Sequence, residues 1–359
     1  GGWGERLIIR LVWFMFIGVI PSIAGMGGLA GAVAEAGNTM FPLLSTEAWV
    51  AISCLLTWLL LYFGSYKSLE RTLLIMVIFF SFMTLVIAIA MQSTEYQVNF
   101  DQISQGLSFS FPTEYLPLAL AVFGFTGISY GEIMAYTYWC LEKGYADNTG
   151  NDIEETKHWI RTMQTDVWVT VFFITLGTLP FFFLGAGVLN SVPQLQESLA
   201  TSSFWDVDVI SSLQNMFSLV LGGWAKWLFI ILAFFVLFST LLSGTAAFTR
   251  TISDYLISMG LVREGTNTRK KLIKLVAFVI PFLSGLFYFI LPNPITLLLI
   301  AGIWAAMGLP IVNIGALYLV NKLEPALQPK VITKVILWAS LILQLFLAGL
   351  IVYDIGLNF

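Results

Sequence analysis

Residues 72–91 read TLLIMVIFFSFMTLVIAIAM, a run of twenty residues that carries no charged side chain. An α-helix rises about 1.5 Å per residue, so about twenty apolar residues cross the roughly 30 Å hydrocarbon core of a bilayer. Lipid offers no hydrogen-bond partners, and a helix satisfies its backbone groups internally. This stretch therefore predicts a transmembrane helix.

The same length and apolar character recur along the whole chain. Of its 359 residues, 58% are hydrophobic and 11% are charged, and the mean hydropathy is +0.86. Soluble domains carry about 25% charged residues, so the composition excludes a water-soluble globule and predicts an all-α polytopic membrane protein in a lipid bilayer. About nine transmembrane helices are expected: Leu11–Val33, Ala48–Gly64, Thr72–Met91, Leu116–Trp139, Val167–Leu189, Trp224–Phe248, Leu272–Leu291, Ile295–Val320 and Ile332–Tyr353.

Lysine and arginine residues assign the loops to the two sides of the membrane, because they resist translocation and accumulate in cytoplasmic loops. If the first residues lie inside, sixteen of the seventeen Lys and Arg residues fall in inner loops. Only Lys226 falls on the outer side. The pattern predicts a multi-pass cell-membrane protein with the N-terminus of this chain inside and its C-terminus outside.

Residues 124–134 read GFTGISYGEIM and interrupt the predicted span Leu116–Trp139 with three glycines and a serine. Glu132 is the clearest charge inside a span, and such charges mark functional candidates because placing them in lipid is costly. Transporter sites often lie where a helix unwinds at mid-membrane and frees carbonyls for a cation. We therefore predict an ion site with Glu132 as its metal ligand. Its residues are Gly127, Ile128, Ser129, Tyr130, Gly131 and Glu132.

An alternative interpretation needs no ion. Gly127 and Gly131 have the small-xxx-small spacing that lets two membrane helices approach closely, and Glu132 would then hydrogen-bond a neighbouring helix. The stretch from Gly25 to Ala32 is rich in small residues and predicts close helix packing of the same kind.

Several polar side chains in later spans are candidates for lining a transport pathway. Hydroxyls in a helix commonly bond back to their own carbonyls, so packing is the competing interpretation. Arg250 and Asp254 stand four residues apart and are expected to pair with each other. The pathway candidates are Ser239, Thr240, Ser243, Thr245 and Asn313.

The sequence offers little for catalysis or for a resident cofactor. Its single His lies in a loop, and it contains no phosphate-binding Gly-Lys-Ser/Thr motif and no His-Glu-x-x-His motif. Two Cys and one His build neither a zinc cluster nor a disulfide framework. A formal net charge of −4 lacks the basic excess of a nucleic-acid binder. We expect neither an enzyme, nor a cofactor, nor a nucleic-acid partner.

Three places in the chain resemble the NRAMP (natural resistance-associated macrophage protein) family of divalent metal transporters. Ser239-Thr240 followed by Ser243-Gly244-Thr245 is similar to the family's eighth helix, and Gly308-Leu309-Pro310 is similar to its tenth. The glycine-rich fourth span stands where the family's sixth helix does. The run from Tyr136 to Ala146 looks like a divergent bacterial branch of the family. The nine spans then correspond to helices three to eleven.

The resemblance implies a single transmembrane domain over residues 1–359 with a LeuT-like inverted-repeat fold. Residues 11–91 would hold three helices of the first repeat, residues 116–320 the five helices of the second, and residues 332–353 an additional C-terminal helix. The family's first two helices, which carry an Asp-Pro-Gly-Asn metal motif, would be missing from this chain, as in an N-terminal truncation. The resemblance also implies a bacterial inner membrane.

The chain departs from the family where metal is bound. The family's Met-Pro-His-Asn in the sixth helix is matched roughly by residues 128–132 here, and acidic residues expected on the third helix are replaced by Met26 and Leu29. A hard carboxylate in place of a thioether favours harder cations.

We therefore predict a secondary transporter for a divalent cation of the Mn²⁺, Fe²⁺ or Mg²⁺ class, with an unspecified coupling ion. One alternative is a LeuT-like symporter for an amino acid or another organic solute. The other alternative is a membrane scaffold without transport activity.

Overall fold

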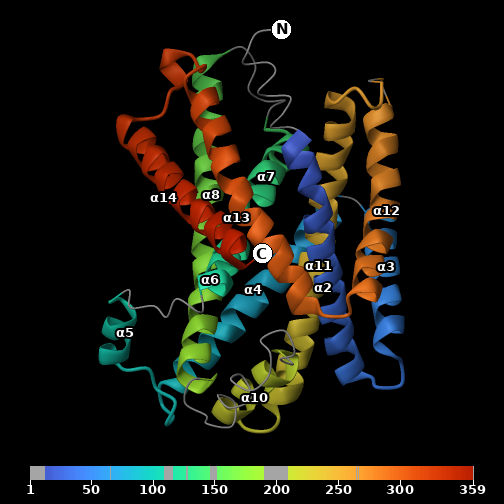
Figure 1. Ribbon diagram of the computed structural model, residues 1–359, viewed down its shortest axis with the longest axis vertical. Helices are drawn as coiled ribbons and strands as arrows, with labels where there is room; N and C mark the ends of the chain where they lie inside the picture. Colours follow the sequence, from blue (N-terminus) through green and yellow to red (C-terminus); the bar gives the residue numbers. More distant parts are fainter. Residues whose placement is uncertain are drawn as a thin grey trace.

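The computed structural model describes residues 13–64, 66–108, 116–126, 128–145, 152–189, 209–263, 265 and 267–358. Within these ranges every regular element is a helix, and the helices form one elongated bundle (Figure 1). The elements are α2 (Val19–Met40), α3 (Thr46–Phe63), α4 (Tyr66–Met91), α5 (Phe100–Gly106), α6 (Leu116–Phe125), α7 (Tyr130–Glu142), α8 (Ile153–Leu184), η3 (Gly185–Leu189), α10 (Val209–Leu221), α11 (Ala225–Ser258), α12 (Thr268–Ile290), α13 (Pro294–Val320), η5 (Pro325–Leu327) and α14 (Val331–Asn358).

Eight helical segments in the described part of the chain are long and apolar enough to cross a membrane, which confirms the all-α polytopic prediction. They comprise α3, α4, α8, α11, α12, α13, α14 and the segment Trp13–Met40, which contains α2. The remaining predicted span, Leu116–Trp139, is divided into α6 and α7, each too short to cross by itself. That these two helices cross the membrane together stays a prediction.

Several helix boundaries differ from the expected ones for local reasons. α2 continues to Met40 because Ala34-Glu35-Ala36 contains no helix breaker. α8 begins at Ile153, well before Val167, because the Asp152 side chain caps it by accepting a hydrogen bond from the Glu154 amide at 3.1 Å. The amphipathic stretch expected over Phe204–Leu221 forms α10, and its residues 204–208 lie outside the described residues.

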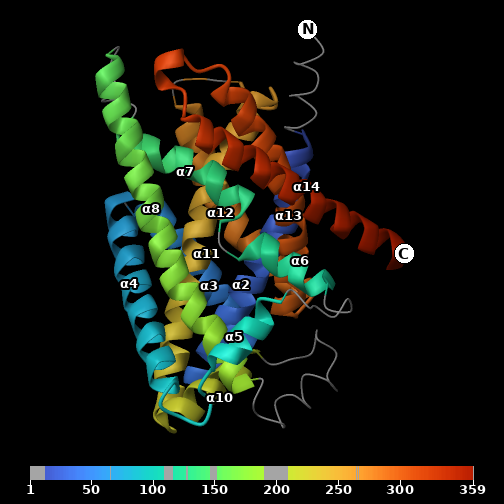
Figure 2. The ribbon, with the colours of Figure 1, turned by 90° about the vertical axis from the view of Figure 1, so that its left-hand side faces the viewer.

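The loops alternate between the two ends of the bundle (Figure 2). We call the end that holds the turns after α7, α11 and α13 the cationic end, because Lys143, Arg263 and Lys322 lie there. The opposite end, which we call the acidic end, holds the segments that follow α2, α4 and α12, with Glu95 and Asp101 among them. The charge sorting read from the sequence therefore corresponds to two physical ends of the molecule.

Helix α2 lies at the centre of the bundle. In the apolar part of the segment Trp13–Met40, which contains α2, 72% of the residues are buried inside the protein, against 11–44% for the other seven spans. It packs against α3, α11, α12 and α13. Its glycines make this possible: a β-carbon at Gly27 would lie 2.5 Å from the Ser284 carbonyl oxygen of α12, and one at Gly28 would lie 2.6 Å from the Pro294 carbonyl oxygen of α13. The close packing predicted for this stretch is confirmed.

The contact at Gly27 yields the first testable prediction. The variant Gly27→Ala places a methyl group against the backbone of α12, which has no flexible side chain to move aside, so it should lower the free energy of unfolding by about 1–3 kcal/mol. Thermal unfolding of the purified protein in detergent measures this loss. The matched control is Gly349→Ala on α14, where nothing lies within 4 Å of the new methyl group. Equal melting temperatures for the two variants would contradict the packing role of Gly27.

Candidate ion site at the helix break

The helical chain is interrupted between Phe125, the last residue of α6, and Tyr130, the first residue of α7. Gly124 places this end of α6 directly on α13, because a β-carbon there would collide with the Gly302 carbonyl oxygen. The predicted site residue Gly127 lies outside the described residues. Ile128 and Ser129 are non-helical, and Ile128 is 37% exposed. The break predicted from the glycines and the serine is therefore present.

Ser129 and Glu132 come together at the start of α7. Ser129 has extended backbone angles, with φ −76° and ψ 170°, and occupies the N-cap position. Its hydroxyl donates a hydrogen bond to the Glu132 carboxylate. Glu132 lies in the first helical turn, where the positive end of the helix dipole favours an anion. Its side chain is exposed, so its carboxylate is open to a ligand.

Tyr130 points into the protein, away from this pair. It is 6% exposed, and its ring lies against Gly308 of α13, where a β-carbon would come within 2.6 Å of the ring. The Ser22 hydroxyl of α2 donates to the Gly18 carbonyl at 2.8 Å. The Tyr130 hydroxyl, 3.2 Å from the Ser22 oxygen, is therefore the donor in that contact. Tyr130 thus fixes the start of α7 and does not share the Ser129–Glu132 surface.

The pathway candidates on α11 use their hydroxyls within the helix. Ser239 and Thr240 both donate to the Val236 carbonyl, at 2.8 and 2.9 Å. Ser243 donates to the Thr240 carbonyl and Thr245 to the Leu241 carbonyl. These contacts are the back-bonding that the packing interpretation expects.

Asn313 contacts the last helix rather than the helix break. Its amide nitrogen donates to the Gln344 side chain at 3.1 Å and to the Leu337 carbonyl at 3.4 Å, both on α14. Such polar contacts hold membrane helices together. The structure therefore gives Asn313 a part in attaching α14 to α13.

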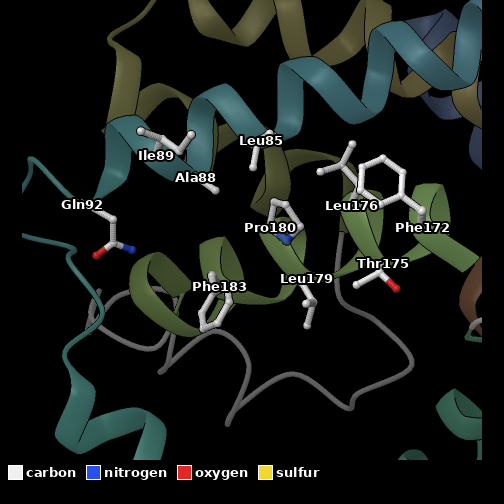
Figure 3. Close-up of a pocket in the computed structure, with 10 residues that line it drawn as sticks. All are labelled: Leu85, Ala88, Ile89, Gln92, Phe172, Thr175, Leu176, Leu179, Pro180 and Phe183. Atoms are coloured by element: carbon white, nitrogen blue, oxygen red, sulfur yellow. The ribbon is translucent and has the colours of Figure 1, made fainter.

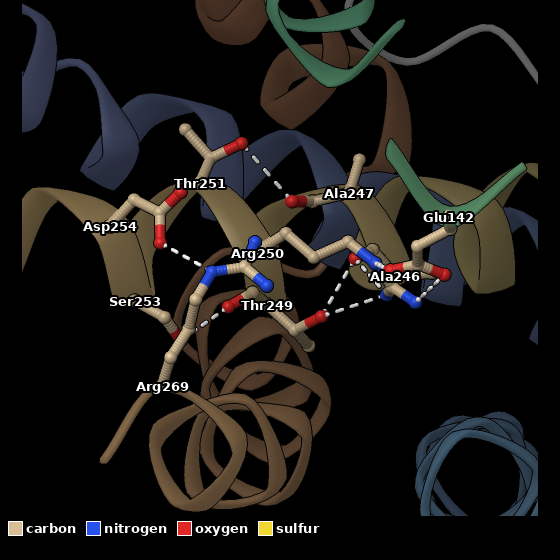
Figure 4. A network of polar contacts seen from close by, with 9 residues as sticks. All are labelled: Glu142, Ala246, Ala247, Thr249, Arg250, Thr251, Ser253, Asp254 and Arg269. Atoms are coloured by element: carbon tan, nitrogen blue, oxygen red, sulfur yellow. Dashed lines mark hydrogen bonds and ion pairs between the residues drawn. The ribbon is translucent and has the colours of Figure 1, made fainter. Parts of the chain in front are cut away.

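The other end of α7 is held by ion pairs, and these correct one prediction (Figure 4). Arg250 of α11 does not pair with Asp254. Its guanidinium donates to both carboxylate oxygens of Glu142, at 2.5 and 2.9 Å, and stacks over the Trp139 ring at 4.7 Å. Asp254 accepts a hydrogen bond from Arg269 of α12 at 2.8 Å. Pairing within one helix was wrong because the long arginine side chains reach partners on neighbouring helices.

A second group of polar contacts follows directly after α7. Lys143 forms ion pairs with Asp166 of α8 at 3.1 Å and with Glu70 of α4 at 3.8 Å. The Tyr145 hydroxyl donates to Asp166 at 2.7 Å. Burial raises the pKa of the Tyr145 phenol, and the hydrogen bond to the Asp166 carboxylate raises it further, so the phenol stays protonated as a donor. These contacts connect α4 and α8 to the end of α7 at the cationic end, and the Arg250–Glu142 pair connects α11 to it as well.

The comparison with protein families decides the identity of the chain. A family model described as natural resistance-associated macrophage protein-like, or Nramp, matches residues 4–354. The chain belongs to the Nramp family. Nramp proteins transport divalent metal cations and are not enzymes, so this is a multi-pass membrane transporter of that kind. A comparison with curated protein sequences found no match.

The described residues of this Nramp protein contain no cluster of three or more His, Cys, Asp or Glu side chains suited to a metal ion. Cys54 and Cys140 are buried on different helices, α3 and α7. Side-chain clusters therefore do not define a metal centre here. The helix break, with one carboxylate, one hydroxyl and non-helical backbone, remains the candidate site.

The sequence reasoning missed the ion pairs around α7. Glu142 and Lys143 follow closely after the predicted span Leu116–Trp139, and Glu70 and Asp166 lie at the same end of two other spans. Opposite charges gathered at the ends of adjacent spans were the available signal. The choice among several partners depends on how the helices pack, which the sequence alone does not give.

The Arg250–Glu142 contact of this Nramp protein yields the second prediction. The side chains are 13% and 27% exposed and form a two-pronged, charge-assisted contact, so a double-mutant cycle with Arg250→Gln and Glu142→Gln should give a coupling energy of about 2 kcal/mol. Unfolding in detergent provides the four free energies. The control cycle uses Lys157 and Glu154, an exposed pair three residues apart on α8 that should couple by less than about 0.5 kcal/mol. Coupling of equal size in both cycles would refute a special role for the α7 contact.

Proposed function

We propose that this Nramp protein moves a divalent cation of the Mn²⁺, Fe²⁺ or Mg²⁺ class through a midplane site at the break between α6 and α7. The observation that carries the proposal is the pairing of the exposed Glu132 carboxylate with the Ser129 hydroxyl where the chain leaves its helical path. Interrupted helices of this kind supply backbone carbonyls to ions in membrane transporters.

The two helix ends at the break carry opposite dipole charges, so the Glu132 carboxylate sets the net sign of the region. The last carbonyls of α6 have no partner further along the helix, and they form the negative end of its dipole. The first turn of α7 presents amide groups, whose positive end is offset by the Glu132 carboxylate. The sum is a region of oxygen atoms with one full negative charge.

The donor set suits hard cations. Carboxylate, hydroxyl and carbonyl oxygens are the ligands that Mg²⁺ and Mn²⁺ prefer. A single carboxylate cannot complete six-fold coordination, and Mg²⁺ commonly keeps several waters in its protein sites. A partly hydrated ion held by few protein ligands can leave the site again, as transport requires.

We infer in addition that the cationic end faces the cytoplasm. Lys and Arg accumulate in inner loops, and the cationic end holds most of the described cations. A divalent cation taken up into the cell would then move from the acidic end towards the cationic end.

The third prediction tests the ion site. In the variant Glu132→Gln the side-chain oxygen can still accept the hydrogen bond from the Ser129 hydroxyl, but the negative charge is lost. Mn²⁺ uptake into proteoliposomes should therefore fall at least about tenfold. The control is Glu154→Gln, which removes an exposed carboxylate at the cationic end and should leave uptake unchanged. An uptake rate of Glu132→Gln equal to that of the wild type would show that Glu132 is not part of the site.

Binding calorimetry on the purified chain separates the proposal from an organic-solute symporter. Heat should be released or absorbed with Mn²⁺ or Mg²⁺ and should disappear in Glu132→Gln, while a panel of amino acids gives no signal. Binding of an amino acid that survives Glu132→Gln would favour the symporter.

A further inference from the structure

A groove runs along the outside of the bundle between α4 and α8 (Figure 3). It encloses about 380 Å³, within the range of small-molecule sites. Its walls are almost entirely apolar, with Leu85, Ala88 and Ile89 from α4 facing Phe172, Leu176 and Leu179 from α8. In a soluble protein, such an apolar groove would indicate a binding site for a partner. Here both helices are candidate membrane spans, so lipid is the medium next to the groove.

The groove opens towards the surface that lipid would cover. Ile89 is 62% exposed and Phe172 is 60% exposed, and only 22% of the apolar part of α4 and 11% of that of α8 are buried in the protein. The two helices also touch directly beside the groove lining, where the Phe80 ring of α4 stacks on the Phe181 ring of α8 at 5.7 Å. The small Ala88 side chain and Pro180, which removes a helical hydrogen bond from α8, lie in the groove itself.

The length of the groove matches one leaflet of a bilayer. Its lining on α8 runs from Phe172 to Phe183, a rise of roughly 16 Å at about 1.5 Å per residue. Half of the roughly 30 Å hydrocarbon core is about 15 Å. The groove begins near the middle of α8 and ends near the acidic end of the bundle.

The polar part of the lining lies at the end where headgroups would be. Gln92 follows the last residue of α4 and stands at one end of the groove, with Phe172 at the other (Figure 3). Its side-chain oxygen accepts a hydrogen bond from the Val98 amide at 3.3 Å, which orients the amide group. Thr175 also lines the groove, but its hydroxyl donates to the Val171 carbonyl at 2.8 Å. The groove is thus apolar along its length and polar at the end where Gln92 lies.

We propose that the groove between α4 and α8 binds one acyl chain of a phospholipid from the leaflet at the acidic end, with the headgroup near Gln92. The bilayer is the medium around these helices, and the groove is continuous with their lipid-facing surfaces. The chemistry, length and polarity of the groove match an acyl chain that hangs from a headgroup. This inference does not depend on the ion site.

The experiment uses the full chain in lipid nanodiscs that contain a phospholipid with a photoactivatable diazirine in the middle of one acyl chain. After illumination, mass spectrometry locates the cross-links. Cross-links should concentrate on residues 85–92 and 172–183. The variant Thr175→Trp fills the groove and should lower this yield about tenfold, because an indole displaces several methylenes of the chain. The matched control, Thr178→Trp, places the same ring on an exposed position of α8 outside the groove and should change the yield less than about twofold.

A second variant guards against misfolding. Ile89→Trp fills the groove from the α4 side and should lower the yield as Thr175→Trp does. Gel-filtration profiles and melting temperatures of all three variants show whether the bundle remains intact. Cross-links spread over the exposed faces of α4, α8 and α14 without enrichment in the groove would overturn the proposal. Equal yields for Thr175→Trp and Thr178→Trp in intact protein would overturn it as well.

Discussion

The close approach of α2 to its neighbours is the contact on which the rest of the bundle depends. In a bilayer no hydrophobic effect drives helices together, because lipid tails are as apolar as leucine, so van der Waals contact must provide the attraction. Gly27 and Gly28 let the backbones of α12 and α13 lie directly on α2, and Gly25 and Gly31 make room for the Ala301 methyl group and the Tyr288 ring. The long helices with the most lipid-facing surface, such as α8 and α14, pack chiefly against other helices, α8 against α4 and α14 against α13.

The position of the break between α6 and α7, where we propose the ion site, follows from this packing. α13, seated on α2, presents Gly302 to Gly124 of α6 and Gly308 to Tyr130 of α7, so one helix places both sides of the break. The far end of α7 is fixed by ion pairs instead. Deep in the bundle, packing a large apolar side chain against a glycine requires no charged group to lose its water. Ion pairs form near the end of the bundle, where water and exposed backbone reduce the free-energy penalty of burying charge.

Much of this arrangement could be predicted from local properties of the sequence. Length and apolar character locate the spans, and the glycines around Ser129 predict the helix break, because each of these signals lies within one segment. The partners of Arg250 and Asn313 could not be predicted in the same way. Arg250 chooses Glu142, which is 108 positions away, over Asp254 on its own helix, and Asn313 contacts Gln344 of α14. Both choices depend on which helices become neighbours. Glu132 was predicted inside a span, but its pairing with Ser129 depends on the helix starting at Tyr130.

The fixed start of α7 also bears on how the proposed site would select a cation with few protein ligands. The Ser129 hydroxyl donates a hydrogen bond to the Glu132 carboxylate. An arriving cation would replace this hydrogen bond by binding the carboxylate directly. The hydroxyl oxygen would then be available as a further ligand to the cation. The backbone need not move for this exchange, because Tyr130 is held against Gly308 and Ser22. Binding then requires little ordering of the protein, and a site whose groups are already in place loses less free energy on binding. The main opposing term is the partial dehydration of the ion, which a smaller, more strongly hydrated cation resists more. On this argument, discrimination among divalent cations at the break rests on their hydration as much as on the number of protein ligands.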